Sequence, residues 1–310
     1  MPTLAPPELS LILPVHNEAA ALDELFTRCL ETLRGYGKPF EIIAVDDGST
    51  DGSLDLLRTW NEKASELRLL VLSRNFGQSP ALYAGFSRAR GHYVAMMDAD
   101  LQNYPEDLPR LFDKLDEGYD MVSGWRSDRK DRIFRTGASR ILNGYIGRST
   151  GLALHDYGCA LKAFRREMVD HMLTLTHRCR YLPVDAAALG GRVAEIEVRH
   201  DPRSHGESKY GLYKLIRTAF DLITSISAAP LQFIGLLGWL FAAVGFLMGI
   251  WVAYVRVTQG NINDMGSVVA IFFFLSGCQM VATGLMCEYI GRIYLEVQAK
   301  PYYVVREELD

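Results

Sequence analysis

Hydrophobic residues follow two alternating patterns over the N-terminal part of the chain. Short apolar runs, typical of buried strands, alternate with segments whose apolar side chains recur every three or four positions, as amphipathic helices require. The expected strands are 10–14, 41–45, 69–72, 93–97 and 119–123, and the helices between them are 17–33, a segment ending near 66, 78–90 and 105–117. This alternation predicts βαβ units and therefore an α/β domain with a mostly parallel sheet.

Two much longer apolar runs lie towards the C-terminus. Residues 231–255 and 268–287 contain no charged side chain, and roughly 20–25 such residues suffice to cross a bilayer as a helix. The short polar loop between them favours a membrane hairpin over two buried core helices. We therefore expect these regions: a globular domain at 1–205, amphipathic interface helices at 206–230, two transmembrane helices within 231–291 (about 231–255 and 268–290), and a C-terminal tail at 292–310.

Basic side chains gather on one side of this hairpin. They precede the first run and follow the second: Lys209, Lys214, Arg217, Arg292, Lys300 and Arg306. The connecting loop carries only Arg256. The positive-inside rule therefore predicts a cytoplasmic globular domain and tail. Residues 1–9 lack the basic and apolar regions of a secretory signal, so we expect none.

The composition excludes several classes of protein. A net charge of −4 gives no reason to expect a nucleic-acid partner. The five cysteines form no CxxC pair, which favours a reduced compartment without structural zinc. No GxGxxG follows the first strand and no GxxxxGK[ST] is present, so dinucleotide and P-loop sites lack their defining residues. Any bound phosphate must then be held by metal and arginine.

Polar side chains follow three of the predicted strands, at His16-Asn17-Glu18, at Asp46-Asp47 and at Asp98 with Asp100. Ligands of open parallel sheets bind at the carboxyl ends of the strands. Asp98 and Asp100 offer two hard oxygen ligands, which suit Mg²⁺ or Mn²⁺ together with substrate phosphates. An acidic turn capping the next helix is the alternative for an isolated pair. The convergence of three polar strand ends favours the metal site.

Three motifs carry a family resemblance. Residues 14–18 (PVHNE), 45–51 (VDDGSTD) and 98–102 (DADLQ) resemble the motifs of family 2 glycosyltransferases with the GT-A fold. Residues 156–159, 205–210 and 288–294 are similar to the branch that transfers sugars to polyprenyl phosphates. The resemblance covers about residues 8–305. It implies a Rossmann-like catalytic domain, a multi-pass location in the bacterial inner membrane, and a homo-oligomer such as a tetramer.

The resemblance also implies roles for individual residues. The nucleotide would contact a set of residues at and after the strand ends: Pro14, His16, Glu18, Val45, Asp47, Ala99, Gln102 and Arg126. His16 is a departure, since the family usually has another class of residue there. Asp98 and Asp100 would hold the diphosphate and its metal, with Gln102 as a further ligand. Asp156 would lie near the sugar, as a base or as an orienting group.

Basic residues supply a site for the acceptor phosphate. They cluster between 126 and 140 and again between 199 and 209. A lipid phosphate is largely ionised at neutral pH, so it needs cations more than a general base. Arginine suits bidentate phosphate contacts. The resemblance favours four of these residues: Arg126, Arg135, Arg203 and Lys209. The alternative is a solvated basic face, or a patch attracted to anionic lipid.

The expected reaction is transfer of a sugar from a UDP-sugar to undecaprenyl (or a similar polyprenyl) phosphate, with inversion. The resemblance points to 4-deoxy-4-formamido-L-arabinose and lipid A or lipopolysaccharide modification, while glucose, N-acetylhexosamines and mannose stay open. A processive polysaccharide synthase would carry a QxxRW motif, which this chain lacks. An inactive, membrane-anchored nucleotide-sugar-binding protein is the alternative of another class, and the intact Asp98, Asp100 and Gln102 argue against it.

Overall fold

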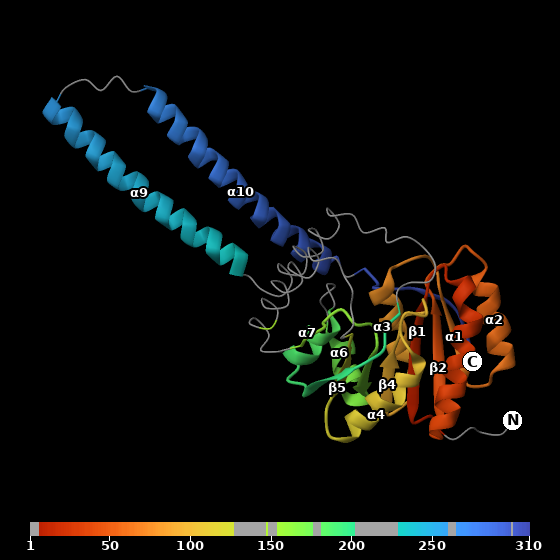
Figure 1. Ribbon diagram of the computed structural model, residues 1–310. Helices are drawn as coiled ribbons and strands as arrows, with labels where there is room; N and C mark the ends of the chain where they lie inside the picture. Colours follow the sequence, from red (N-terminus) through yellow and green to blue (C-terminus); the bar gives the residue numbers. More distant parts are fainter. Residues whose placement is uncertain are drawn as a thin grey trace. The chain divides into compact units, whose positions relative to one another are not determined.

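A computed structural model of the chain describes residues 6–126, 147, 154–175, 181–201, 229–259, 265–298 and 300–310. The chain forms two compact units, one of Met1–Tyr210 with Lys300–Asp310 and one of Gly211–Ala299. The first unit is an α/β domain (Figure 1) built on an eight-stranded sheet of order β7-β5-β6-β4-β1-β2-β3-β8.

Four parallel strands form the centre of the sheet. They are β1 (Leu9–Val15), β2 (Phe40–Asp46), β3 (Leu67–Leu72) and β4 (Tyr93–Met96). β1 pairs with β2 and β4, and β2 pairs with β3, all in parallel register. Nearly all their residues are buried, as continuous apolar strands are when helices cover both faces of a sheet. The predicted α/β class with a mostly parallel sheet is confirmed.

Helices cover both faces of this sheet. On one face, α1 (Ala19–Tyr36), α2 (Ser53–Lys63) and α4 (Leu108–Asp116, after the 3-10 turn Pro105–Asp107) share one apolar core cluster. On the other, α3 (Gln78–Arg88), α6 (Arg166–Thr174) and α7 (Leu182–Ala188) share a second. The domain is therefore a three-layer α/β/α sandwich (Figure 1).

The sheet continues beyond β4 with mixed strand directions. β6 (Lys162–Arg165) is antiparallel to both β4 and β5 (Met121–Trp125), and β7 (Val193–Glu197) is parallel to β5. The sequence pattern predicts β5 but neither β6 nor β7. The register sets Lys162 beside Met96 of β4 and Ser123 of β5. A lysine thus lies next to β4, the strand that Asp98 follows.

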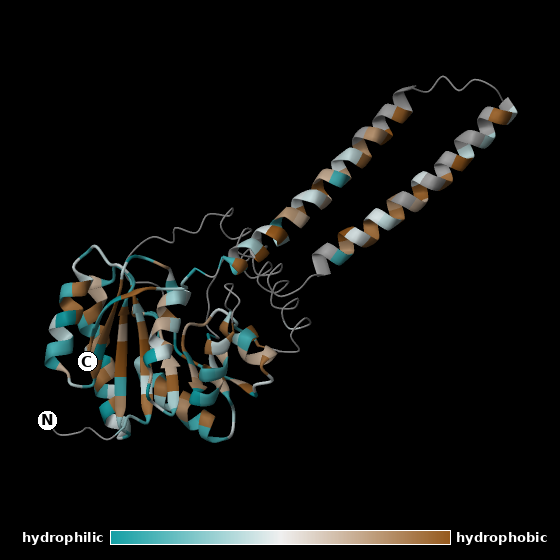
Figure 2. Ribbon diagram, turned by 180° about the vertical axis from the view of Figure 1, so that it is seen from behind, coloured by the Kyte–Doolittle hydropathy of each residue, from teal (hydrophilic) through white to brown (hydrophobic). Residues whose placement is uncertain are grey.

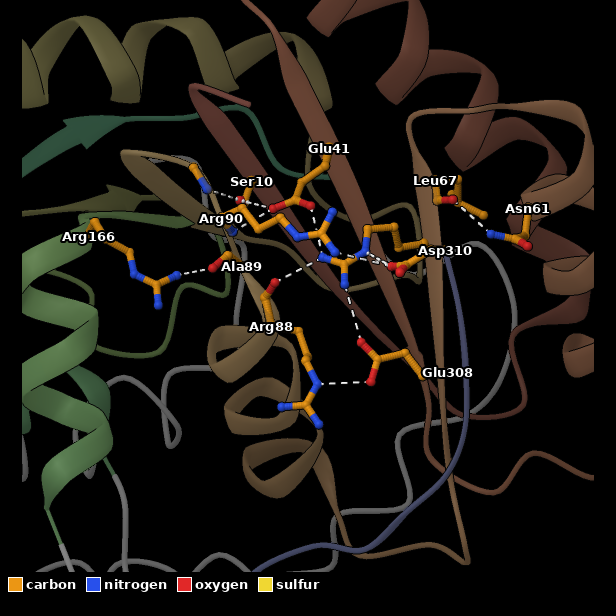
Figure 3. Close-up of polar contacts among 12 residues, drawn as sticks. Ser10, Glu41, Asn61, Leu67, Arg88, Ala89, Arg90, Arg166, Glu308 and Asp310 are labelled. Atoms are coloured by element: carbon orange, nitrogen blue, oxygen red, sulfur yellow. Dashed lines mark hydrogen bonds and ion pairs between the residues drawn. The ribbon is translucent and has the colours of Figure 1, made fainter. Parts of the chain in front are cut away.

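The last strand, β8 (Val305–Leu309), comes from the C-terminal tail and pairs antiparallel with β3. A buried arginine on β3, Arg68, holds it there. Its guanidinium contacts Asp310 at 2.5 Å, Glu41 at 3.0 Å and Glu308 at 3.2 Å. Figure 3 labels these three acidic partners. The end of the predicted tail is therefore a strand of the sheet in the α/β domain.

The second unit consists, among its described residues, of two long helices, α9 (Ala229–Gln259) and α10 (Met265–Val297). Each contains one of the long apolar runs, and apolar residues recur along both (Figure 2). Phe241 of α9 contacts Phe274 of α10 edge to face, with ring centroids 5.5 Å apart. Within the described part of the chain, no helix meets the combined length and apolarity required to cross a membrane. Residues 206–228 of the predicted interface region lie outside the described residues.

Candidate active site

The carboxyl ends of β1 and β2 lie side by side, and polar contacts join the residues that follow them. His16 Nδ1 lies 2.9 Å from the main-chain oxygen of Asp47, and its Nε2 lies 2.9 Å from the side-chain Nδ2 of Asn75. The side chain of His16 is exposed. The structure thus brings His16 and Asp47 together as predicted, and adds Asn75, which follows β3.

The loop after β2 caps the helix that follows β1. α1 has no capping side chain of its own. Ser53 and Asp51 accept hydrogen bonds from the main-chain N–H groups of Glu18 and Ala19, at 3.0 and 3.1 Å. Asn17, with a positive φ of 58°, accepts one from the Thr50 N–H at 2.7 Å. Much of the residue 45–51 motif therefore fixes the shape of this edge.

Asp47 binds the loop that opens α3. Its two carboxylate oxygens accept hydrogen bonds from the main-chain N–H groups of Phe76 and Gly77, at 2.7 and 2.8 Å. Burial raises the pKa of Asp47, and these two hydrogen bonds partly offset the rise. Gly48 beside it has a φ of +67°, and a Cβ there would lie 2.6 Å from the nitrogen of Asn75. The predicted contact of Asp47 with the nucleotide stays a prediction.

Asp98 and Asp100 follow β4 in a tight turn. Asp98 accepts a 2.5 Å hydrogen bond from Nε2 of Gln78, the first residue of α3. Asp100 accepts hydrogen bonds from Gln102, through Nε2 at 2.6 Å and the main-chain N–H at 3.2 Å. Leu101, between Asp100 and Gln102, has a φ of 60°, a conformation that bulky residues seldom adopt. Each carboxylate is therefore oriented by one glutamine.

The aspartate pair has the charge distribution of a cation site. Burial and the neighbouring Asp100 raise the pKa of Asp98 to about 6. A divalent cation would relieve that repulsion between carboxylates. No group of three or more His, Cys, Asp or Glu side chains suitable for a metal occurs among the described residues. Two carboxylates with positions left for phosphate oxygens and water are what Mg²⁺ commonly uses, so these residues fit such an ion.

Arg126 and Asp156 form a second polar group of the domain. Arg126, just after β5, donates to both carboxylate oxygens of Asp156, at 2.6 and 3.1 Å. The Gly158 N–H also donates to Asp156, at 3.1 Å. Glu195 of β7 accepts the Asp156 main-chain N–H at 3.0 Å. Both Asp156 oxygens thus bind N–H donors, which favours the orienting role over the base.

Lys162 is a residue of this region that the motifs do not reveal. It is only 4% exposed, and its ammonium donates to the main-chain carbonyl of Cys159. Burial lowers the pKa of Lys162, while the charges of Asp156 and Asp98 act in the opposite direction. The available sequence signal is a lysine inside an otherwise apolar stretch, 159–164.

Other predicted site residues are distributed differently. Val45 and Ala99 are buried in the core, with 0% and 3% of their surface exposed, so their side chains present almost no surface to a nucleotide. Pro14 and Glu18 are partly exposed at the strand end. The acceptor residues Arg135, Arg203 and Lys209 lie outside the described residues.

Arg199 belongs to the second basic cluster, but it is paired with an acid in the fold. Its guanidinium lies 3.3 Å from Asp107, and its main-chain N–H donates to the same carboxylate at 2.9 Å. Two residues on, the Asp201 N–H donates to the Gln102 carbonyl at 3.1 Å. The chain after β7 therefore returns to the turn that carries Asp98 and Asp100.

Comparison with known proteins identifies the family to which the sequence motifs pointed. The model of glycosyl transferase family 2 matches residues 10–173. Undecaprenyl-phosphate 4-deoxy-4-formamido-L-arabinose transferase of Edwardsiella ictaluri (strain 93-146) is 41% identical over 302 residues, 96% of this chain and 93% of that one. The protein of the same name from Shewanella sediminis (strain HAW-EB3) is 40% identical, over 97% and 92% of the two chains.

Solved structures share the fold at low identity. Mannosyl-3-phosphoglycerate synthase from Rubrobacter xylanophilus has a TM-score of 0.52 at 15% identity, covering 72% of this chain and 74% of that one. Glucosyl-3-phosphoglycerate synthase from Mycobacterium tuberculosis, in complex with Mn²⁺, UDP and phosphoglyceric acid, has a TM-score of 0.50 at 18% identity, covering 72% and 78%.

The fold and the aspartate pair at the end of β4, together with these comparisons, define a glycosyltransferase with a GT-A-like domain. The chain belongs to glycosyl transferase family 2. The resemblance of its three motifs to that family is confirmed.

Proposed function

We propose that this enzyme transfers a sugar from a UDP-sugar to undecaprenyl (or a similar polyprenyl) phosphate at the cytoplasmic face of the bacterial inner membrane, with inversion. The observation that carries the proposal is the presence in one domain of an aspartate pair suited to a cation and of Arg126, a guanidinium that Asp156 orients. The names of the relatives support the acceptor. They also favour 4-deoxy-4-formamido-L-arabinose as the sugar, ahead of glucose, N-acetylhexosamines or mannose.

On the donor side, Asp98 and Asp100 would hold Mg²⁺ or Mn²⁺, which neutralises charge on the departing diphosphate. Gln78 and Gln102 keep the two carboxylates in place through hydrogen bonds of 2.5 and 2.6 Å. Gln102 is therefore proposed to orient Asp100, in addition to its predicted role as a ligand.

The nucleotide is proposed to lie over the ends of β1 and β2. His16 has the exposed ring, and the partly exposed Pro14 and Glu18 flank it. Asp47 would act chiefly by holding the loop at Gly77, since both its carboxylate oxygens bind main-chain N–H groups.

On the acceptor side, Arg126 is proposed to bind the lipid phosphate. Asp156 fixes the plane of its guanidinium through two hydrogen bonds, which leaves less side-chain freedom to lose on binding. Arg135, Arg203 and Lys209 are proposed to add further cations. An ionised phosphate attacks the anomeric carbon without proton removal, so Asp156 serves as the orienting group.

The two long helices are proposed to form the membrane hairpin, with 206–230 as the interface region. The support is their sequence and their surface. They expose many large apolar side chains, among them Phe233, Leu236, Trp239, Trp251, Phe272 and Ile290. Such a surface is stable in lipid or against other protein. Assembly of several copies, as predicted from the resemblance, is part of the proposal.

The test is release of the nucleoside diphosphate, UDP or GDP, by purified full-length protein in nanodiscs containing undecaprenyl phosphate. A panel of UDP- and GDP-sugars would be offered with Mg²⁺, Mn²⁺ or EDTA. We expect metal-dependent release for one donor, and a loss of about 100-fold or more in Asp98→Asn with an unchanged circular dichroism spectrum. Unchanged turnover of Asp98→Asn would contradict the proposal. Donor binding without UDP release under every condition would favour the inactive binding protein.

A further inference from the structure

Lys162 carries a buried ammonium group on β6, the strand that lies between β4 and β5 in the sheet. By register it pairs with Met96 of β4, two residues before Asp98, and with Ser123 of β5, three residues before Arg126. Its side chain is almost fully enclosed, so a substrate does not reach the ammonium. Any influence on the reaction must therefore pass through neighbouring groups.

The contact of Lys162 leads to the turn that carries Asp156. Its ammonium donates to the carbonyl of Cys159, three residues after Asp156. That turn packs closely on β5: a Cβ on Gly124 would lie 2.8 Å from Sγ of Cys159. The Gly124 N–H also donates to the Leu161 carbonyl at 2.8 Å. Lys162 thus helps to hold the turn from one side while β5 holds it from the other.

The electrostatics link Lys162 to both halves of the site. A buried ammonium is costly unless acidic groups compensate it, and a carbonyl oxygen is only a neutral acceptor. Asp156 and Asp98 both favour the charged form of Lys162, and Arg126 opposes it. One fixed cation therefore compensates a carboxylate of the proposed donor side and a carboxylate of the proposed acceptor side.

We propose that Lys162 is a positioning residue for the transfer reaction. It holds the turn that carries Asp156, and it partly offsets the negative charge of Asp98 before metal and nucleotide bind. The inference rests on the proposed function. Through Asp156 it fixes Arg126, the residue proposed to bind the acceptor phosphate.

Replacing Lys162 by a neutral residue should change metal binding and turnover in opposite directions. A cation close to Asp98 repels a divalent metal, so removing it should tighten metal binding. The same removal frees the turn that orients Arg126, so turnover should fall. A lysine that merely stabilises the fold would weaken both properties together. The opposite signs therefore distinguish a positioning role from a structural one.

The experiment uses full-length protein in nanodiscs and three variants: Lys162→Met, Lys162→Arg and the control Lys114→Met. Lys114 lies on α4, is partly exposed and pairs with Glu117 at 2.6 Å. Mn²⁺ affinity is measured without nucleotide at about pH 8, where Asp98 is ionised, and UDP release is measured with undecaprenyl phosphate. Melting temperatures are recorded for each protein.

We expect Lys162→Met to bind Mn²⁺ about 3- to 10-fold more tightly and to lose about 10- to 100-fold in kcat/KM for the lipid phosphate. Lys162→Arg should recover most of the turnover, and Lys114→Met should match the wild type in both assays. If Lys162→Met does not fold, Lys162→Gln carries the same expectations.

Weaker or unchanged Mn²⁺ binding in the neutral variant, with an active wild type, would overturn the role of Lys162 and leave the proposed function standing. A wild-type protein that binds no Mn²⁺ and releases no UDP would overturn the proposed function, and this inference with it.

Discussion

Gln78 donates a 2.5 Å hydrogen bond to Asp98, so the first residue of α3 orients a carboxylate in the turn that follows β4. The other end of the same helix contacts the C-terminal tail: Arg88 pairs with Glu308 at 3.0 Å, and Tyr303 donates to Ser87 at 3.0 Å. One helix thus connects the last strand of the sheet with the proposed donor site.

Replacing Gln78 by Leu should reduce kcat/KM for the nucleotide sugar about tenfold, because Asp98 loses its orienting donor. Metal titrations of UDP release should show a higher half-saturating concentration of Mn²⁺. Ser79→Ala, at the next position of α3, is the control and should behave as wild type. Wild-type kinetics in Gln78→Leu would show that this hydrogen bond has no role in turnover.

Ionisation of Asp98 should destabilise the metal-free protein as the pH rises. Burial and Asp100 raise the pKa of Asp98 to about 6, so the ionised form is penalised in the folded state. That penalty is fully present above the folded pKa and disappears as pH falls below the unfolded value of about 4.

Asp98→Asn should therefore be more stable than wild type at neutral pH in EDTA, by about 1 kcal/mol or more, and the difference should vanish near pH 4. Urea denaturation at several pH values measures it. A difference that stays constant with pH would contradict the assignment.

The pair of Arg126 and Asp156 gives a test of the acceptor side. Arg126→Lys should raise KM for undecaprenyl phosphate about tenfold, because an ammonium cannot make both hydrogen bonds to Asp156. KM for the donor should change less than about twofold.

Asp156→Asn distinguishes an orienting group from a base. It should raise the acceptor KM while leaving the shape of the pH–rate profile unchanged, since no proton is removed by this group. Disappearance of the acidic limb of the profile in Asp156→Asn would instead identify a base.

Two arginines that pair with β8 should contribute unequally to stability. Arg68 is 8% exposed and binds Glu41, Glu308 and Asp310, whereas Arg58 is 41% exposed and binds Glu307. Arg68→Met leaves the buried Glu41 without its cation and should cost about 3 kcal/mol or more. Arg58→Met removes a largely solvated pair and should cost less than about 1 kcal/mol. Denaturant unfolding of the two variants compares them directly, and equal losses would refute a special role for Arg68.

The sequence by itself determined the parallel half of the domain and the position of the aspartate motif at residues 98–102. β1 to β5 are apolar runs bounded by polar residues, so local pattern suffices to place them within a few residues. Asp98 and Asp100 follow such a run directly, and the family resemblance of their motif is confirmed. Asn75 and Gln78 follow β3 at the same sheet edge, and the rule for parallel strand ends extends to them.

Only the tertiary structure decided the rest of the sheet and the contacts between distant residues. β6 begins with Lys162 and ends with Arg165, and β8 has three consecutive charged residues between Val305 and Leu309. Neither strand forms an apolar run, so the sequence pattern does not reveal it. β6 is held by hydrogen bonding to β4 and β5. β8 is held by pairing with β3 and by the ion pair between Arg68 and Glu308. The pairing of Arg126 with Asp156 joins side chains thirty residues apart. Local periodicity cannot encode such partners, since they depend on which strands become neighbours in the folded sheet.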